Sequence, residues 1–105
     1  MKTLLISGLL ALATLGAHAK DVVVDVRTPQ EYAAGHVEGA INIEHGAIAQ
    51  GLAKAGVTKD DKVLLYCQSG VLSGKALNTL KDLGFTKAEN VGGIAQARKI
   101  LATTK

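Results

Sequence analysis

Residues 63–75 read Val63-Leu64-Leu65-Tyr66-Cys67-Gln68-Ser69-Gly70-Val71-Leu72-Ser73-Gly74-Lys75. The apolar run before the cysteine is typical of a buried strand, and the small and polar residues after it lead into a helical pattern. This order predicts a thiol at the carboxyl end of a strand, surrounded by backbone N–H groups where a helix begins. Such surroundings favour the thiolate, which is the reactive form of cysteine. The spacing alone leaves open a buried cysteine that acts only as a small apolar side chain.

Cys67 is the only cysteine in the 105 residues, so an intramolecular disulfide is excluded.

The first residues of the chain indicate the cellular compartment of the protein. It has a basic Met1-Lys2, an apolar stretch over residues 4–17 and an Ala17-His18-Ala19 cleavage pattern before Lys20. These parts together predict a secretory signal peptide over residues 1–19, and they disfavour the alternative of a buried N-terminal helix. We therefore expect a periplasmic or secreted protein. A lone thiol in an oxidising compartment suggests that the thiol has a function.

Residues 20–105 are expected to form one small domain with a modest core. The chain has 12 basic and 9 acidic residues, and the charges are interspersed without a basic block or a set of aromatic residues. Nucleic acid is therefore not an expected partner. The apolar stretch at the start is too short to favour a membrane span, and no membrane association is expected after cleavage. The histidines and the cysteine lack metal-site spacing, so we expect neither a metal nor a cofactor. A monomer is favoured.

Strand-like and helix-like segments alternate along residues 20–105. Strands are predicted at residues 22–26, 41–43, 63–66 and 88–91, and helices at 29–34, 45–55, 70–83 and 94–103. Gly92 and Gly93 are predicted to form a turn, and Leu83 to belong to the apolar stripe of the third helix. This alternation predicts an α/β fold with a central parallel sheet and helices on both faces. Because ligands bind at the carboxyl ends of the strands in such sheets, Cys67 lies at the expected site.

Three blocks of sequence resemble the rhodanese family. They are Asp25-Val26-Arg27-Thr28-Pro29-Gln30-Glu31-Tyr32-Ala33-Ala34-Gly35-His36-Val37-Glu38-Gly39-Ala40-Ile41-Asn42-Ile43, then Tyr66-Cys67-Gln68-Ser69-Gly70, then Asn90-Val91-Gly92-Gly93. The blocks follow the family order, and the chain resembles in particular the short secreted bacterial rhodaneses of the phage-shock-protein-E type. The resemblance implies a small α/β domain and thiosulfate sulfurtransferase activity through a persulfide on Cys67.

In the implied reaction, the Cys67 thiolate takes the outer sulfur of thiosulfate and releases sulfite. Cyanide or a thiol then accepts the sulfur. Backbone N–H groups of residues 68 to 73 would stabilise the anionic intermediate. The residues expected to bind the donor are therefore Gln68, Ser69, Gly70, Val71, Leu72 and Ser73.

The loop departs from the family pattern, which often carries an arginine in the form C-x-S-G-x-R-S. Leu72 occupies the place of that arginine, and the loop has no charged side chain. We therefore expect weak affinity for thiosulfate, with Lys75 as a partial substitute for the missing cation. The uncharged loop also resembles, more loosely, that of mercaptopyruvate sulfurtransferases. Phosphatases with this loop design need an arginine where Ser73 stands, so phosphatase activity is not expected.

Several other polar residues are expected to be structural. Asp25 and Arg27 lie at the same sheet edge, and Arg27 is expected to pair with Glu31 or Asp25. His36 is expected to make a structural hydrogen bond, and His45 to lie on the surface where a helix begins.

Two other functions remain open from the sequence. One is a non-catalytic rhodanese-like module that binds sulfur carriers or anions, which the missing arginine supports. The other is a thiol redox sensor, which a lone exposed thiol would support.

Overall fold

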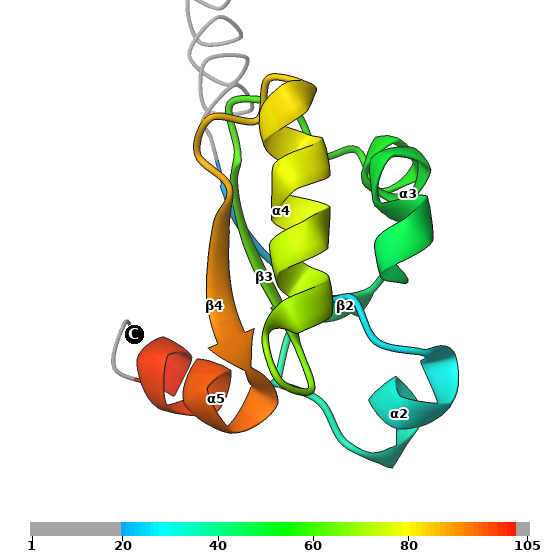
Figure 1. The fold of residues 1–105 in the computed structure, drawn as a ribbon, viewed down its shortest axis with the longest axis vertical. Helices are drawn as coiled ribbons and strands as arrows, with labels where there is room; N and C mark the ends of the chain where they lie inside the picture. Colours follow the sequence, from blue (N-terminus) through cyan, green and yellow to red (C-terminus); the bar gives the residue numbers. More distant parts are fainter. Residues whose placement is uncertain (1–19, 103–105) are drawn as a thin grey trace, which may run out of the picture.

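The computed structural model describes residues 20–102. The elements follow one another as β1 (Asp21–Asp25), α2 (Pro29–Ala34), β2 (Ile41–Asn42), a 3-10 turn (His45–Ala47), α3 (Ile48–Lys54), β3 (Lys62–Cys67), α4 (Val71–Asp82), β4 (Glu89–Gly93) and α5 (Ile94–Ala102) (Figure 1). The predicted signal peptide and residue 103 of the last predicted helix lie outside the described residues.

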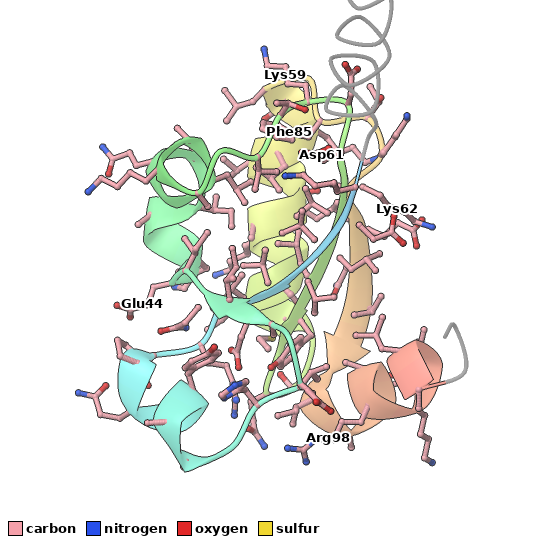
Figure 2. The ribbon with its side chains drawn as sticks, turned by 180° about the vertical axis from the view of Figure 1, so that it is seen from behind. Glu44, Lys59, Asp61, Lys62, Phe85 and Arg98 are labelled. Atoms are coloured by element: carbon pink, nitrogen blue, oxygen red, sulfur yellow. The ribbon has the colours of Figure 1, made fainter. Side chains whose placement is uncertain are left out.

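The strands form one parallel sheet in the order β2-β1-β3-β4. The main apolar core joins β1 and β3 to α3 and α4, and a smaller cluster joins the opposite face of β3 to α5. Figure 1 shows α4 running across one face of the strands. Seen from behind in Figure 2, side chains fill the space between the strands and these helices. The predicted α/β fold with helices on both faces is confirmed.

Local signals in the sequence explain where the helices begin and end. The Thr28 side chain accepts the N–H of Glu31 while the Glu31 carboxylate accepts the N–H of Thr28, which is the capping box that starts α2. After α4, Gly84 takes a left-handed φ of +98°, and the Phe85 N–H returns to the Leu80 carbonyl. Phe85 is buried. These two predicted boundaries are confirmed.

Three local predictions are wrong. Gly92 and Gly93 do not form a separate turn, because they complete β4 and α5 begins at the next residue. The predicted helix over residues 45–55 begins with the 3-10 turn and is α-helical only from Ile48. Leu83 is the C-cap residue after α4 and is 42 % exposed, whereas Leu80 in the last turn is buried in the core.

Because the strands are parallel, their carboxyl ends all lie at one side of the molecule. Figure 2 shows Lys62, where β3 begins, well away from Arg98, which lies beside the carboxyl ends. Among residues 20–102, no helix has both the length and the apolar character that crossing a membrane requires.

Candidate active site

Cys67 is the last residue of β3 and pairs with Gly93 of β4. Its side chain belongs to the main core cluster on the α3 and α4 face, and the residue is only 1 % exposed. This burial does not fit the exposed thiol that the redox-sensor alternative relied on. The loop after Cys67 and the first turn of α4 both place N–H groups against the sulfur.

Three donors from the loop and α4 point at the Cys67 sulfur. The Gly70 N–H lies 2.9 Å from Sγ, and both the N–H and the hydroxyl of Ser73 lie 3.4 Å from it. Burial by itself raises the pKa of the Cys67 thiol. Hydrogen bonds from Ser73, Ser69 and Gly70 outweigh burial and hold the pKa below its ordinary value. The positive end of α4 acts in the same direction. The geometry therefore favours the thiolate without a charged side chain.

The loop is shaped by glycines that allow two stretches of backbone to approach closely. Gly70, the N-cap of α4, has a φ of +95°, and a Cβ there would lie 3.2 Å from the Gly92 Cα. A Cβ on Gly93 would lie 2.6 Å from the Gln68 carbonyl oxygen. Side chains at Gly70 or Gly93 would push β4 away from the loop. The family-like Gly-Gly pair therefore packs against the cysteine loop.

Asn90 of β4 also holds this loop, and the sequence analysis did not assign it a role. Its Oδ1 accepts the Ser73 hydroxyl at 2.7 Å and the Gly92 N–H at 2.9 Å. Its Nδ2 donates to the Gly70 carbonyl at 3.0 Å. An asparagine two residues before a glycine is a signal for a local side-chain turn, but nothing in that signal predicts a contact with Ser73.

The structure divides the six residues predicted to bind the donor. Gly70 and Ser73 donate to the sulfur, and the Ser69 backbone also lowers its pKa, whereas the side chains of Gln68 and Ser69 are exposed. Val71 is 63 % exposed at the edge of the loop. Leu72 is partly buried and packs against the main core cluster, so at the position of the family arginine there is an apolar contact.

Tyr66, the neighbour of Cys67, points to the opposite face into a second polar group. Its hydroxyl donates to Asp25 Oδ2 at 2.8 Å and accepts the Val37 N–H at 2.9 Å. Arg27 pairs with Asp25 at 2.7 Å and donates to the Gly35 carbonyl. This confirms a structural role for the pair and selects Asp25 over Glu31 as the partner of Arg27.

Burial and hydrogen bonding have opposing effects on the pKa values of Asp25, Arg27 and Tyr66. Burial would raise the pKa of Asp25, but hydrogen bonds from Arg27 and Tyr66 outweigh it and lower that pKa. Burial raises the pKa of Tyr66 to about 12. The hydrogen bond to Asp25 raises the pKa of Arg27. Both members of the ion pair therefore stay charged at neutral pH.

The histidines of the described chain lie apart from the sulfur. His36 stacks on Tyr32 with ring centroids 3.7 Å apart, and its Nδ1 lies 2.9 Å from the Tyr32 carbonyl. The expected structural role of His36 is confirmed. His45 is exposed where the 3-10 turn begins, as expected. Within residues 20–102, no group of three or more potential ligands is arranged to hold a metal ion.

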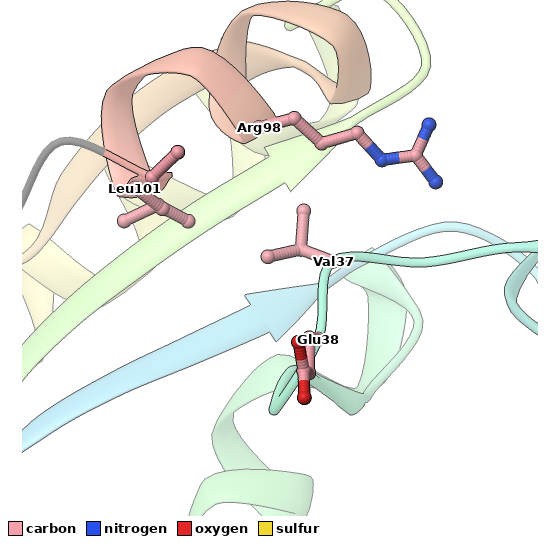
Figure 3. A pocket seen from close by; sticks show the side chains of 5 residues that line it. Val37, Glu38, Arg98 and Leu101 are labelled. Carbon is pink, nitrogen blue, oxygen red and sulfur yellow. The ribbon is translucent and has the colours of Figure 1, made fainter. Parts of the chain in front are cut away.

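A pocket of about 320 Å³ lies beside the sheet edge, between the segment after α2 and α5. It is lined by Val37, Glu38, Arg98, Leu101 and Ala102, so no residue of the cysteine loop lines it. Figure 3 shows the Arg98 side chain extending past the carboxyl ends of the strands. The Arg98 guanidinium lies 3.7 Å from where a Cβ on Gly35 would be. Arg98 is thus a cation at this edge that the sequence analysis did not identify.

Comparison with known proteins agrees with this geometry. A family model described as Rhodanese-like domain matches residues 11–98. The chain is 42% identical to the thiosulfate sulfurtransferase PspE of Escherichia coli (strain K12) over 90 residues, covering 83% of this chain and 86% of that protein. It is 37% identical to the thiosulfate sulfurtransferase GlpE of Pseudomonas entomophila (strain L48), covering 80% of this chain and 72% of that protein.

A solved structure supports the same relationship. The rhodanese with anions from E. coli matches with a TM-score of 0.69 and 39% sequence identity, covering 72% of this chain and 89% of that chain. The sequence and the three-dimensional arrangement therefore point to one family.

Proposed function

The chain belongs to the rhodanese-like domain family, and on that premise we propose that it is a thiosulfate sulfurtransferase that carries sulfur as a persulfide on Cys67. One observation carries the proposal. The only cysteine of the chain lies at the carboxyl edge of the sheet, with its sulfur 2.9 Å from one loop N–H and 3.4 Å from another. These donors lower the pKa of Cys67 and so increase its thiolate fraction at neutral pH.

The proposed reaction has two displacements at sulfur. In the first, the Cys67 thiolate attacks the outer sulfur of thiosulfate, a bond forms between the two sulfurs, and the electron pair of the broken bond leaves with sulfite. The outer sulfur of the resulting persulfide carries the negative charge. In the second, cyanide or a thiol takes the outer sulfur, and the electron pair returns to Sγ. Neither step needs an oxidant or a reductant.

The donors around Sγ support both displacements. The N–H groups of Gly70 and Ser73 are fixed by the start of α4, so they need no rearrangement when charge leaves or returns. The neutral loop provides no cation for a dianionic donor. We therefore expect thiosulfate to bind weakly, with a high KM. Lys75 is exposed one turn into α4, and Arg98 adds a second positive charge at this edge.

The place of action and the assembly state are part of the proposal. The predicted signal peptide over residues 1–19 supports a periplasmic or secreted protein, with residues 20–105 as the active domain. We propose a monomer that meets small-molecule donors and acceptors. The six loop residues from Gln68 to Ser73 are the proposed donor-binding residues.

A coupled assay with thiosulfate and cyanide tests the function, with thiocyanate as the measured product. Wild-type protein should form thiocyanate, and Cys67→Ser should form none. Asn78→Ala, on the exposed side of α4, serves as a folded control with normal activity. Thiocyanate formation by Cys67→Ser would contradict the assignment of Cys67.

Mass spectrometry after exposure to thiosulfate tests the intermediate. The wild-type protein should gain the mass of one sulfur atom on Cys67, and cyanide should remove it. Thiosulfate binding without this mass gain would favour a non-catalytic anion-binding module, for which the neutral loop is the supporting feature. Burial of Cys67 at 1 % exposure removes the support for a redox sensor with an exposed thiol.

A further inference from the structure

The Ser73 hydroxyl lies between two acceptors. Its Oγ is 3.4 Å from the Cys67 sulfur and 2.7 Å from Asn90 Oδ1. A serine hydroxyl has one hydrogen, so it donates to only one of these acceptors at a time. Ser73 is 0 % exposed and Cys67 is 1 % exposed. Asn90 is exposed, so water can replace the hydrogen bond that its Oδ1 gives up but not one that the buried sulfur gives up.

Asn90 is held so that its oxygen faces Ser73. The Gly92 N–H donates to Oδ1 at 2.9 Å, and Nδ2 donates to the Gly70 carbonyl at 3.0 Å. These two contacts fix which end of the amide is the oxygen. The 2.7 Å distance from Ser73 is typical of a good hydrogen bond between a hydroxyl and an oxygen acceptor. Both acceptors are within hydrogen-bond distance of the hydroxyl, and the shorter contact to Asn90 favours donation to Asn90 over donation to the sulfur.

We propose that Asn90 is a positioning residue for sulfur transfer, because it competes with Cys67 for the hydrogen of the Ser73 hydroxyl. This inference rests on the proposed role of Cys67 as the sulfur carrier. When Sγ is uncharged, as a thiol or as the inner sulfur of a persulfide, Ser73 donates to Asn90. When Sγ is a thiolate, the hydroxyl rotates toward it, because hydrogen bonds to charged acceptors are the stronger ones. The hydrogen stays bonded to the Ser73 oxygen throughout.

This rotation follows the charge through the reaction. Negative charge leaves Sγ when the persulfide forms and returns when the acceptor takes the outer sulfur. Asn90 receives the hydroxyl in the first state and releases it in the second. It therefore makes the thiolate less favourable than Ser73 alone would make it, which limits how readily Cys67 leaves from the persulfide.

Competition for the hydroxyl and a purely structural role predict opposite changes in the pKa of Cys67 when Asn90 is removed. If Asn90 only held the loop in shape, its removal would misalign the N–H groups around Cys67 and raise the pKa of the thiol. If it competes for the hydroxyl, its removal frees Ser73 for the sulfur and lowers the pKa. The second effect disappears when Ser73 has no hydroxyl.

Charged groups on the surrounding elements are the same in the wild type and in every alanine variant. They are Lys75 on α4, Glu89 on β4, Asp25 on β1, which is paired with Arg27, and Arg98 and Lys99 on α5. None of these described side chains hydrogen-bonds the Cys67 sulfur. Differences between variants therefore report the Ser73 hydroxyl and Asn90.

The experiment is a pH titration of Cys67, followed by the ultraviolet absorbance of its thiolate. With only one cysteine, the chain gives one such signal, and no reagent has to reach the buried sulfur. Ser73→Ala should raise the midpoint by about one pH unit, the expected effect of one hydrogen bond to a charged group. Asn90→Ala should lower it by about half a unit, and should have no effect when combined with Ser73→Ala. A midpoint that rises or stays unchanged in Asn90→Ala, or a shift of equal size in both backgrounds, would overturn the proposal.

Asn90→Asp is the second variant, used if Asn90→Ala does not fold. A carboxylate binds the Ser73 hydroxyl more tightly, so the midpoint should rise by about one unit, and by less than half of that in the Ser73→Ala background. Equal rises in the two backgrounds would show an effect of charge alone and overturn the proposal. Asn78→Asp, which adds the same charge at an exposed position of α4, should leave the midpoint unchanged. Because no thiosulfate is present, a failure of sulfur transfer would leave this readout intact.

Discussion

Tyr66 and Cys67 are adjacent in β3, and they lead into two polar regions built in different ways. Tyr66 joins a buried network in which a carboxylate, a guanidinium and a phenol hold one another. Cys67 is surrounded by backbone N–H groups and one hydroxyl, with no charged partner. Because successive strand residues point to opposite faces, one strand end supports both regions.

The two regions differ in whether their buried charges cancel. In the Tyr66 region, the charges of Asp25 and Arg27 cancel, and among the described residues no buried side-chain nitrogen or oxygen lacks a hydrogen-bond partner. A region with all its charges and hydrogen bonds paired stabilises the fold but offers no free reactive group. In the Cys67 region, the donors carry only partial charges, so a full negative charge on sulfur stays available for chemistry.

Asp25→Ala should destabilise the fold by about 3–5 kcal/mol, because it leaves Arg27 buried without its partner. Urea unfolding measures this loss. Glu89→Ala is the control, since it breaks an exposed 3.4 Å ion pair with Lys62 and should cost no more than about 1 kcal/mol. Equal losses in the two variants would contradict the view that the Tyr66 region holds the fold. If the alanine variant does not fold, Asp25→Asn tests the same charge with less change of shape.

Gly70→Ala should mainly damage the Cys67 region. Both Gly70 and Gly56 have a positive φ, +95° and +77°, so alanine should cost about 1–2 kcal/mol of stability at either position. Only at Gly70 does a Cβ meet backbone, 3.2 Å from the Gly92 Cα, whereas Gly56 has nothing within 4 Å. The rate of sulfur transfer should therefore fall by about tenfold to a hundredfold in Gly70→Ala and stay normal in Gly56→Ala. Similar rates in both variants would show that the loop tolerates the displacement.

The two regions should respond to pH in different ranges. The lowered pKa of Asp25 adds stability that is present above its ordinary pKa of 3.8 and is lost as the pH falls through the folded value. Urea unfolding across acid pH should show this loss in the wild type and a smaller one in Asp25→Asn.

The Cys67 region should titrate at higher pH. Its lowered pKa means that the loading rate with thiosulfate falls about tenfold per pH unit below that pKa. The midpoint of this rate profile should lie below that of an ordinary cysteine. The same shift adds stability above the ordinary pKa of cysteine, which is lost as the pH falls through the folded value. A midpoint at or above the ordinary value would contradict the role of the loop donors.

Leu72→Arg should bring a charged side chain to the otherwise neutral loop. We expect the KM for thiosulfate to fall by about three- to tenfold, the effect of one partly solvated charge contact. Leu83→Arg is the matched control, since Leu83 is 42 % exposed at the other end of α4. An unchanged KM in Leu72→Arg, or an equal fall in both variants, would show that the missing arginine does not limit donor binding.

Much of the fold follows from local features of the sequence. The capping box at Thr28 and Glu31, the glycine after α4 and the apolar run before Cys67 each fix one element boundary through contacts between near neighbours. The predictions were wrong where contacts between residues far apart in the sequence determine the local structure. Gly92 and Gly93 look like a turn, but pairing with Cys67 and packing against the loop draw them into β4.

The features of the candidate site also separate into those set by neighbouring residues and those set by distant contacts. That a single thiol ends a strand where a helix follows, and that its loop carries no charge, can be read from the order of adjacent residues. Contacts made in the folded chain bury the thiol, pair Arg27 with Asp25, and bring Asn90 from another strand to Ser73 and Gly70. Seventeen or more positions separate Asn90 from these partners. No local pattern encodes such contacts, because they exist only after β3 and β4 pair.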